Sequence, residues 1–142
     1  MKMLRWVLVS LGLLAALAGC ASLGPPFLPL ASVPSGKAVV YLYRPSSFVG
    51  SAISFTVNAG ELPVINLSNG GYFPYVTTPG RISFWAKTEA ESFVIIEVEP
   101  GMEYYLKGTV GMGVLVGRPN LQQMPPELGR LEILDCKLIP LM

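Results

Sequence analysis

The 142-residue sequence contains no histidine and only two cysteines, Cys20 and Cys136. Without imidazole, the commonest general base and metal ligand is missing, and so is every catalytic triad that depends on it. Zinc sites built from cysteine and histidine cannot form either. No P-loop or dinucleotide-binding glycine motif occurs. We therefore expect a protein that is not an enzyme and that has no cofactor and no metal.

Charge is also scarce. Charged residues make up 13% of the chain, with ten Lys and Arg against nine Asp and Glu. This balance gives no basic surface that would collect nucleic acid, so we expect no nucleic-acid partner. Hydrophobic residues reach 51%, which a disordered chain would not have. The length suits one domain with one core.

The first 20 residues have the layout of a bacterial lipoprotein signal. Lys2 and Arg5 precede an apolar stretch, Trp6 to Ala18, which is too short for a membrane span of about 20 residues. The run Leu17-Ala18-Gly19-Cys20 resembles the lipobox, in which the cysteine thiol receives a diacylglyceryl group and cleavage falls just before it. A plain secretory signal is the alternative, because the residues around the cleavage point are small.

We therefore expect a signal peptide over residues 1–19 and a lipidated Cys20. Ala21 is not the aspartate that resembles an inner-membrane retention signal, which favours the periplasmic face of the outer membrane. With Cys20 blocked by lipid, Cys136 has no partner within the chain. We expect Cys136 to be a buried, inert thiol, and the alternative is a disulfide between molecules.

Residues 20–36 are predicted to form a Pro-rich linker after the lipidated cysteine. Four prolines oppose both helix and central strand. An extended linker of this length would reach up to about 50 Å, at roughly 3.1 Å per residue. Its apolar residues Phe27, Leu28 and Leu30 would lie either along the domain or near the lipid surface.

Residues 37–142 are predicted to form a small antiparallel β-sandwich of about seven strands. Lys37 to Arg44 is apolar on both faces and predicts a central strand that is covered on both sides. Alternating patterns predict further strands at residues 51–58, 61–67, 72–77, 81–87, 93–99 and 102–107. An apolar run from Val110 to Val116 also looks like a strand.

Turn residues separate these segments. Asn69-Gly70-Gly71 predicts a hairpin, and Pro79-Gly80 and Pro100-Gly101 predict type II turns. A Pro-rich break is expected from Pro119 to Pro126. Residues 127–139 are predicted to form a short helix that passes into an extended end, with a final strand as the alternative.

Two groups of side chains are candidate functional residues. Trp85, Tyr72 and Tyr75 are possible ligand contacts, because aromatic rings on an open sheet face can stack on sugars. Aromatic residues in strands more often pack in the core. Glu97 and Glu99 fall on one strand face and could form an acid/base pair, but a solvated edge strand explains them better.

Several motifs occur in a recognisable order: Val39-Val40-Tyr41-Leu42-Tyr43-Arg44-Pro45, Gly71-Tyr72-Phe73, Pro79-Gly80, and Pro100-Gly101 with Tyr104-Tyr105-Leu106. Over residues 37–139 this order resembles an uncharacterised family of bacterial lipoprotein domains of unknown function. The resemblance implies a compact β-sandwich, similar to prealbumin-like or PEGA-like modules, attached to the cell envelope. It implies no catalytic or ligand residues.

The sequence thus predicts a lipid-anchored cell-envelope lipoprotein with a structural or protein-interaction β-domain. Its expected partners are the membrane, through Cys20, and an envelope protein whose identity the sequence does not give. The alternative is a glycan-binding or peptidoglycan-binding module that uses exposed aromatic residues.

Overall fold

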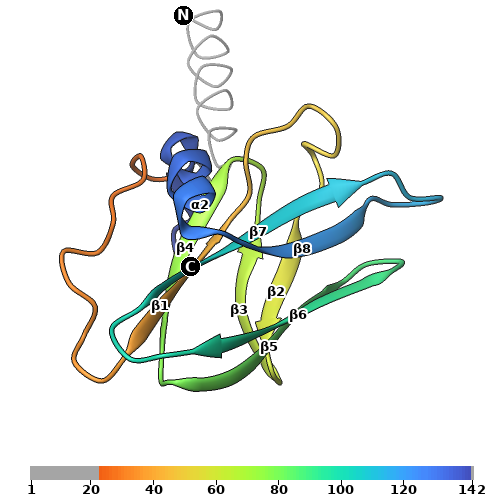
Figure 1. The fold of residues 1–142 in the computed structure, drawn as a ribbon. Coiled ribbons are helices and arrows are strands. Elements are labelled where there is room, and N and C mark those ends of the chain that lie inside the picture. Colours follow the sequence, from red (N-terminus) through yellow and green to blue (C-terminus); the bar gives the residue numbers. More distant parts are fainter. Residues whose placement is uncertain (1–22, 142) are drawn as a thin grey trace, which may run out of the picture.

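The computed structural model describes residues 23–141. The predictions for the signal peptide (1–19) and for Cys20 therefore lie outside the described residues. Within them, nine strands form two sheets that pack face to face, with one short α-helix near the C-terminus (Figure 1). The predicted small β-sandwich is confirmed.

The five-stranded sheet has the order β8 (Arg118–Met124), β7 (Glu103–Gly111), β1 (Ala38–Tyr43), β4 (Gly71–Thr77), β9 (Lys137–Leu138). The four-stranded sheet has the order β3 (Leu62–Leu67), β2 (Phe55–Ala59), β5 (Gly80–Lys87), β6 (Glu91–Val98). Two pairs are parallel, β1 with β7 and β4 with β9. The sandwich is therefore not purely antiparallel, and its described part has more strands than the seven predicted.

Strand β1 is the central strand that the sequence predicts. All six of its residues are buried. Val40 and Leu42 face the core between the two sheets, which we call the inter-sheet core. Val39, Tyr41 and Tyr43 face the other way. They belong to a second cluster on the outer face of the five-stranded sheet, the outer core, made up of Val39, Tyr41, Tyr43, Tyr72, Tyr105, Ile133 and Cys136.

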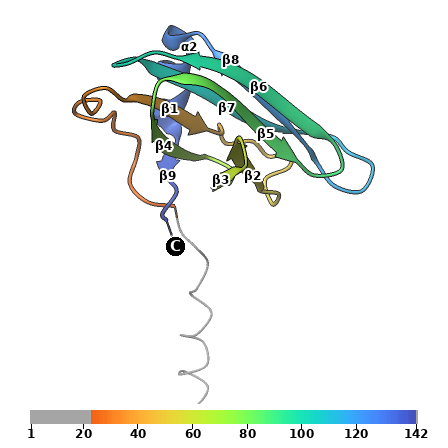
Figure 2. The same cartoon turned by 90° about the horizontal axis from the view of Figure 1, so that it is seen from below.

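Residues 23–36 lie against this outer face, and we call them the strap. Its Phe27 ring packs edge-to-face on Tyr41 and Tyr72, with ring centroids 5.4 and 5.0 Å apart. The backbone N–H of Phe27 donates to the carbonyl of Cys136 at 2.9 Å. Figure 2 shows the orange-red strap passing beside β9 before the chain turns into β1. The reach of a free linker therefore does not apply to residues 23–36, because burying their apolar side chains holds them on the sheet.

The predicted turn residues lie between strands, but they connect the sheets in a different way. Gly101 has the φ of 76° that a type II turn requires, whereas Gly80, with a φ of 136°, is already the first residue of β5. Asn69-Gly70-Gly71 joins β3 of one sheet to β4 of the other, with Gly70 at a φ of 71°, so the predicted hairpin is wrong. Pro79-Gly80 and Pro100-Gly101 also lie at crossings between the sheets. A turn motif reports local backbone conformation and does not say whether the flanking strands pair with each other.

The region after Gly108 differs from prediction in two places. The run from Val110 to Val116 is not one strand, because β7 ends at Gly111 and residues 112–117 form the tip of the β7–β8 hairpin. The predicted break from Pro119 to Pro126 contains strand β8. Its proline, Pro119, is tolerated because β8 lies at the edge of its sheet, where a missing N–H leaves no neighbour unpaired.

The C-terminal prediction is confirmed. Helix α2 (Pro126–Glu132) leads into the 3-10 turn η2 (Ile133–Asp135) and then the short strand β9. Gly129 allows α2 to lie directly on Tyr105, where any larger side chain would collide. Cys136 is fully buried and unpaired in the outer core, as expected. Burial raises the pKa of its thiol to about 11, so the thiol stays protonated and unreactive.

Candidate functional site

The structure does not bring the three predicted aromatic residues together. Tyr72 is buried in the outer core, and Tyr75 faces the inter-sheet core, where its ring packs edge-to-face on Phe84. Trp85 lies on the open face of the four-stranded sheet, and its indole N–H donates to the carbonyl of Gly60 at 2.7 Å. Only Trp85 is therefore placed to meet a ligand.

The carboxylates at the edge of this sheet have a simple surface role. Glu97 lies opposite Arg81 on the neighbouring strand, and the two form an exposed ion pair with a separation of 3.8 Å. Strand β6, which carries Glu97, is an edge strand. Charges at such an edge discourage pairing with other chains, and this agrees with the solvated-edge interpretation.

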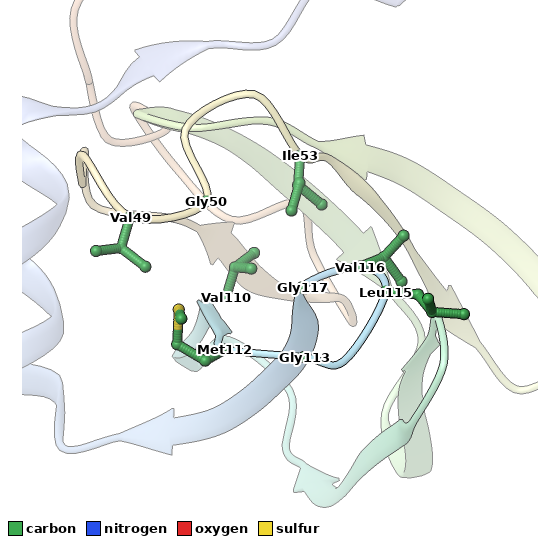
Figure 3. Close-up of a pocket in the computed structure, with 10 residues that line it drawn as sticks. Val49, Gly50, Ile53, Val110, Met112, Gly113, Leu115, Val116 and Gly117 are labelled. Atoms are coloured by element: carbon green, nitrogen blue, oxygen red, sulfur yellow. The ribbon is translucent and has the colours of Figure 1, made fainter.

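The most exposed apolar side chains lie elsewhere, in two loops at one end of the sandwich. The loop between β1 and β2 carries Phe48, which is 95% exposed. In the β7–β8 hairpin tip, Leu115, Met112 and Val114 are 89%, 84% and 83% exposed. We call the following set the loop patch: Phe48, Val49, Met112, Val114, Leu115 and Val116. Figure 3 shows the two loops facing each other.

A buried arginine holds the first loop. Arg44, at the end of β1, is 1% exposed. Its guanidinium donates to the carbonyls of Gly50 and Ile53 in the loop and, at 3.5 Å, to that of Leu67 in β3. It also lies over the ring of Phe55, at 5.8 Å from the centroid. These bonds fix the path of a loop that has no regular secondary structure.

The charge of Arg44 is balanced by dipoles. The ion pairs found among residues 23–141 do not include it. Burial accordingly lowers the pKa of Arg44 from its ordinary value. A buried cation is costly unless polar groups surround it, and here three backbone carbonyls accept hydrogen bonds from its two terminal nitrogens. Arg44 therefore ties the loop to the core far more firmly than a surface arginine would.

A carboxylate holds the hairpin tip. Glu89, in the β5–β6 turn, accepts hydrogen bonds from the backbone N–H groups of Leu115 at 3.1 Å and Val114 at 2.6 Å. It also pairs with Arg118 at 3.1 Å. The bonds from Leu115 and Val114, and then from Arg118, lower the pKa of Glu89. The tip is thus braced by the neighbouring hairpin even though its side chains are exposed.

The two loops also pack against each other. A Cβ on Gly50 would lie 2.7 Å from Val110, and a Cβ on Gly117 would lie 2.8 Å from Ile53, so only glycine permits the contact at both positions. Gly50 also has a φ of 70°, which a larger residue would rarely adopt. A cavity of about 210 Å³ remains between the loops (Figure 3).

All the side chains that line this cavity are apolar. Its lining consists of Val49, Gly50, Ile53, Val110, Gly111, Met112, Gly113, Leu115, Val116 and Gly117. Such a surface can take up apolar groups but supplies no acid, base or nucleophile. Within residues 23–141, no three side chains of Cys, Asp and Glu meet as metal ligands, and no helix is long and apolar enough to cross a membrane.

Sequence reasoning missed the loop patch because an apolar run normally indicates a buried strand. The signal that was present is the glycine spacing. Gly111, Gly113 and Gly117 interrupt the run at the points where the chain turns, and a Cβ on Gly113 would collide with the carbonyl of Val116. Phe48 had no such signal, because it stands in a short segment of small and polar residues.

Comparison with known proteins adds no relative. No protein-family model matches the chain, and neither a curated protein nor a solved structure matches it. The resemblance to a family of lipoprotein domains therefore stays a prediction.

Proposed function

We propose that this protein is a lipid-anchored lipoprotein of the bacterial cell envelope whose β-domain is a non-enzymatic interaction module. The lipobox-like run ending at Cys20 supports the anchor, and Ala21 favours the periplasmic face of the outer membrane. One observation carries the interaction role: Phe48, Leu115 and their neighbours are exposed on loops that are rigidly braced.

Exposed apolar side chains on a braced frame favour binding for two reasons. First, contiguous apolar surface on a soluble domain marks interaction sites. Second, a loop that is already ordered loses little conformational entropy when it binds. Arg44 and Glu89 supply that order for the two loops of the patch.

Mass spectrometry of the mature protein tests the anchor. We expect the N-terminal peptide to begin at Cys20 and to carry a thioether-linked diacylglyceryl group. A Cys20→Ser variant, grown with a labelled fatty acid, should incorporate none of it. An unmodified Cys20, or a mature N-terminus at another residue, would refute the anchor.

Photo-crosslinking in intact cells tests the interaction role. A photoreactive amino acid at Leu115 should give abundant crosslinks to whatever the patch contacts, lipid or protein, whereas the same group at Met102, which is half exposed at the other end of β7, should give few. Equal product patterns at both sites would contradict an interaction role for the loop patch.

A second candidate function is glycan binding through Trp85. Trp85 lies beside Phe93 across β5 and β6, and Phe93 is 63% exposed, so an apolar stacking surface exists on the open face. Retention on purified peptidoglycan should then fall for Trp85→Ala and remain unchanged for Phe48→Ala. Background retention of the unaltered protein excludes this candidate.

A further inference from the structure

The described chain begins at the same end of the sandwich as the loop patch. Leu23 and Ser46 both approach the β3–β4 turn, since a Cβ on Gly70 would lie 3.6 Å from the Ser46 side chain and 4.0 Å from that of Leu23. The backbone N–H of Ser47 also donates to the side-chain oxygen of Asn69 at 2.9 Å. The strap and the loop that carries Phe48 therefore start side by side.

The hairpin tip projects from this end as well. Strands β1 and β7 are parallel and in register, so Tyr43 and Lys107 lie side by side and both strands run toward the same end. Beyond them the chain forms the Phe48 loop and the β7–β8 tip. In Figure 1 the loop between β1 and β2 rises at the top and the β7–β8 tip extends to the right, and residues of both line the same cavity.

We infer that the loop patch inserts into the surface of the lipid bilayer that holds the lipid on Cys20. This inference rests on the proposed lipid anchor. Cys20 precedes Leu23 by three residues, which span at most about 10 Å even when fully extended. A lipid at Cys20 therefore holds this end of the sandwich, with its exposed Phe48, close to the membrane.

The charge distribution fits a lipid surface better than a protein partner. Neither residues 45–54 nor residues 112–117 contain Lys, Arg, Asp or Glu. Of the charges next to the patch, those of Glu89 and Arg118 are paired with each other, and that of Arg44 is buried beneath the first loop on backbone carbonyls. Burial of apolar side chains alone would drive insertion, so binding would depend little on the charge of the lipid headgroups.

Insertion at these points sets the orientation of the domain. The lipid on Cys20 and the two loops contact the membrane at one end, and the opposite end, with the Pro100-Gly101 turn and Met102, lies away from it. The open face of the four-stranded sheet, with Trp85, then stands roughly along the membrane normal and stays in contact with water. A partner in the aqueous phase would have access to that face.

Fluorescence quenching in vesicles tests the inference. The full, lipidated protein would be placed in neutral phosphatidylcholine vesicles with a thiol-linked, environment-sensitive dye at Leu115→Cys or Phe48→Cys. Met102→Cys, exposed and apolar but at the far end, is the matched control. Cys136 is fully buried, so the unaltered protein should take up no dye. Mass spectrometry of the same samples would report the lipid on Cys20.

We expect lipids with a nitroxide on the acyl chain to quench the dye at both patch positions strongly and the dye at Met102 hardly at all. Anionic vesicles should give the same result. Lipidated protein whose patch dyes are quenched no more than the Met102 dye would refute insertion and leave the anchor intact. Blue-shifted patch dyes without lipid quenching would indicate a protein occupant and also refute it. Quenched patch dyes on protein with an unmodified Cys20 would support insertion while refuting the anchor.

Discussion

The two sheets of the sandwich share the inter-sheet core but differ on their outer faces. The five-stranded sheet is covered on that face, where Tyr41 and Tyr43 are fully buried. The four-stranded sheet is open, and Phe93 and Ile95 are exposed on it. The difference comes from segments that belong to neither sheet, since the strap and α2 cover only the first. The strap and α2 thus cover the five-stranded sheet as a third layer of the sandwich would.

The covering layer is joined by specific polar contacts as well as by packing. The N–H of Leu30 in the strap donates to the hydroxyl oxygen of Tyr41 at 2.9 Å. Tyr43 donates to Glu132 at the end of α2 at 2.6 Å, and Lys107 pairs with the same carboxylate at 2.8 Å. These contacts bind the strap and the helix to the face separately, so each can be weakened on its own.

Of the variants proposed below, Tyr41→Ala on the covered face should lower the stability most. Removing this buried ring leaves a void under the strap and removes the acceptor for Leu30. We expect the free energy of unfolding, measured by urea denaturation, to fall by about 3–5 kcal/mol. Phe93→Ala, on the open face, should lower it by less than about 1 kcal/mol. Equal losses in the free energy of unfolding for the two variants would mean that the outer core stabilises the fold no more than the open face does.

Arg44→Met should have the next largest effect. The variant removes a buried charge and takes away the guanidinium bonds to the carbonyls of Gly50, Ile53 and Leu67, and we expect the free energy of unfolding to fall by about 2–3 kcal/mol. The amide of Ile53, which donates to Gly50, should exchange its hydrogen faster. Arg118→Met, at an exposed position, is the control. A stability unchanged from wild type would show that the loop does not depend on the guanidinium.

Glu132→Gln should weaken only the contact between the helix and the covered face. We expect the free energy of unfolding to fall by about 1 kcal/mol at neutral pH. Burial acts to raise the pKa of Glu132, but hydrogen bonds from Lys107 and Tyr43 outweigh it and lower the pKa. The carboxylate therefore stabilises the fold above its unfolded pKa, and this contribution is lost as the pH falls below about 4.5. In urea denaturation, the difference in the free energy of unfolding between wild type and Glu132→Gln should be smaller at pH 3 than at pH 7. Glu61→Gln, in an exposed turn, should have the same free energy of unfolding as wild type at both pH values.

Glu89→Gln should have the smallest effect on stability, because it acts on the hairpin tip alone. In the unaltered protein, the amide chemical shifts of Val114 and Leu115 should titrate with a midpoint below 4.5, since their hydrogen bonds hold the pKa of Glu89 down. Protonation at lower pH should release the tip. A midpoint at or above 4.5 would contradict the bracing role.

Local patterns predicted the elements that depend on local physics. The apolar residues of β1 on both faces correctly indicated a strand covered on both sides, and the alternation of Val94, Ile96 and Val98 gave the inward face of β6. Pairing between distant strands has no local signal. The parallel pairing of β1 with β7, and the crossing of Asn69-Gly70-Gly71 between sheets, follow from how the whole chain closes around its core.

The loop patch was unpredictable for a different reason. An apolar residue in a sequence favours burial, so Met112 to Val116 looked like a strand interior. Their exposure follows from Glu89, which lies in a separate hairpin and fixes the tip outward. The strap shows the reverse case. Its prolines indicated a linker, whereas Phe27 and Leu30 have enough apolar surface to hold the segment on the sheet.

The strap also determines when the domain can finish folding. Phe27 is synthesised early, but its backbone N–H donates to the carbonyl of Cys136, near the C-terminus. The carbonyl of Pro25 likewise accepts from the N–H of Leu138. During synthesis the strap can contact Tyr41 soon after β1 is made, but its backbone partners at the C-terminal end are missing until β9 has emerged. Contacts so distant in sequence close slowly. The layer that covers β1 can therefore be completed only after the last described strand has been made.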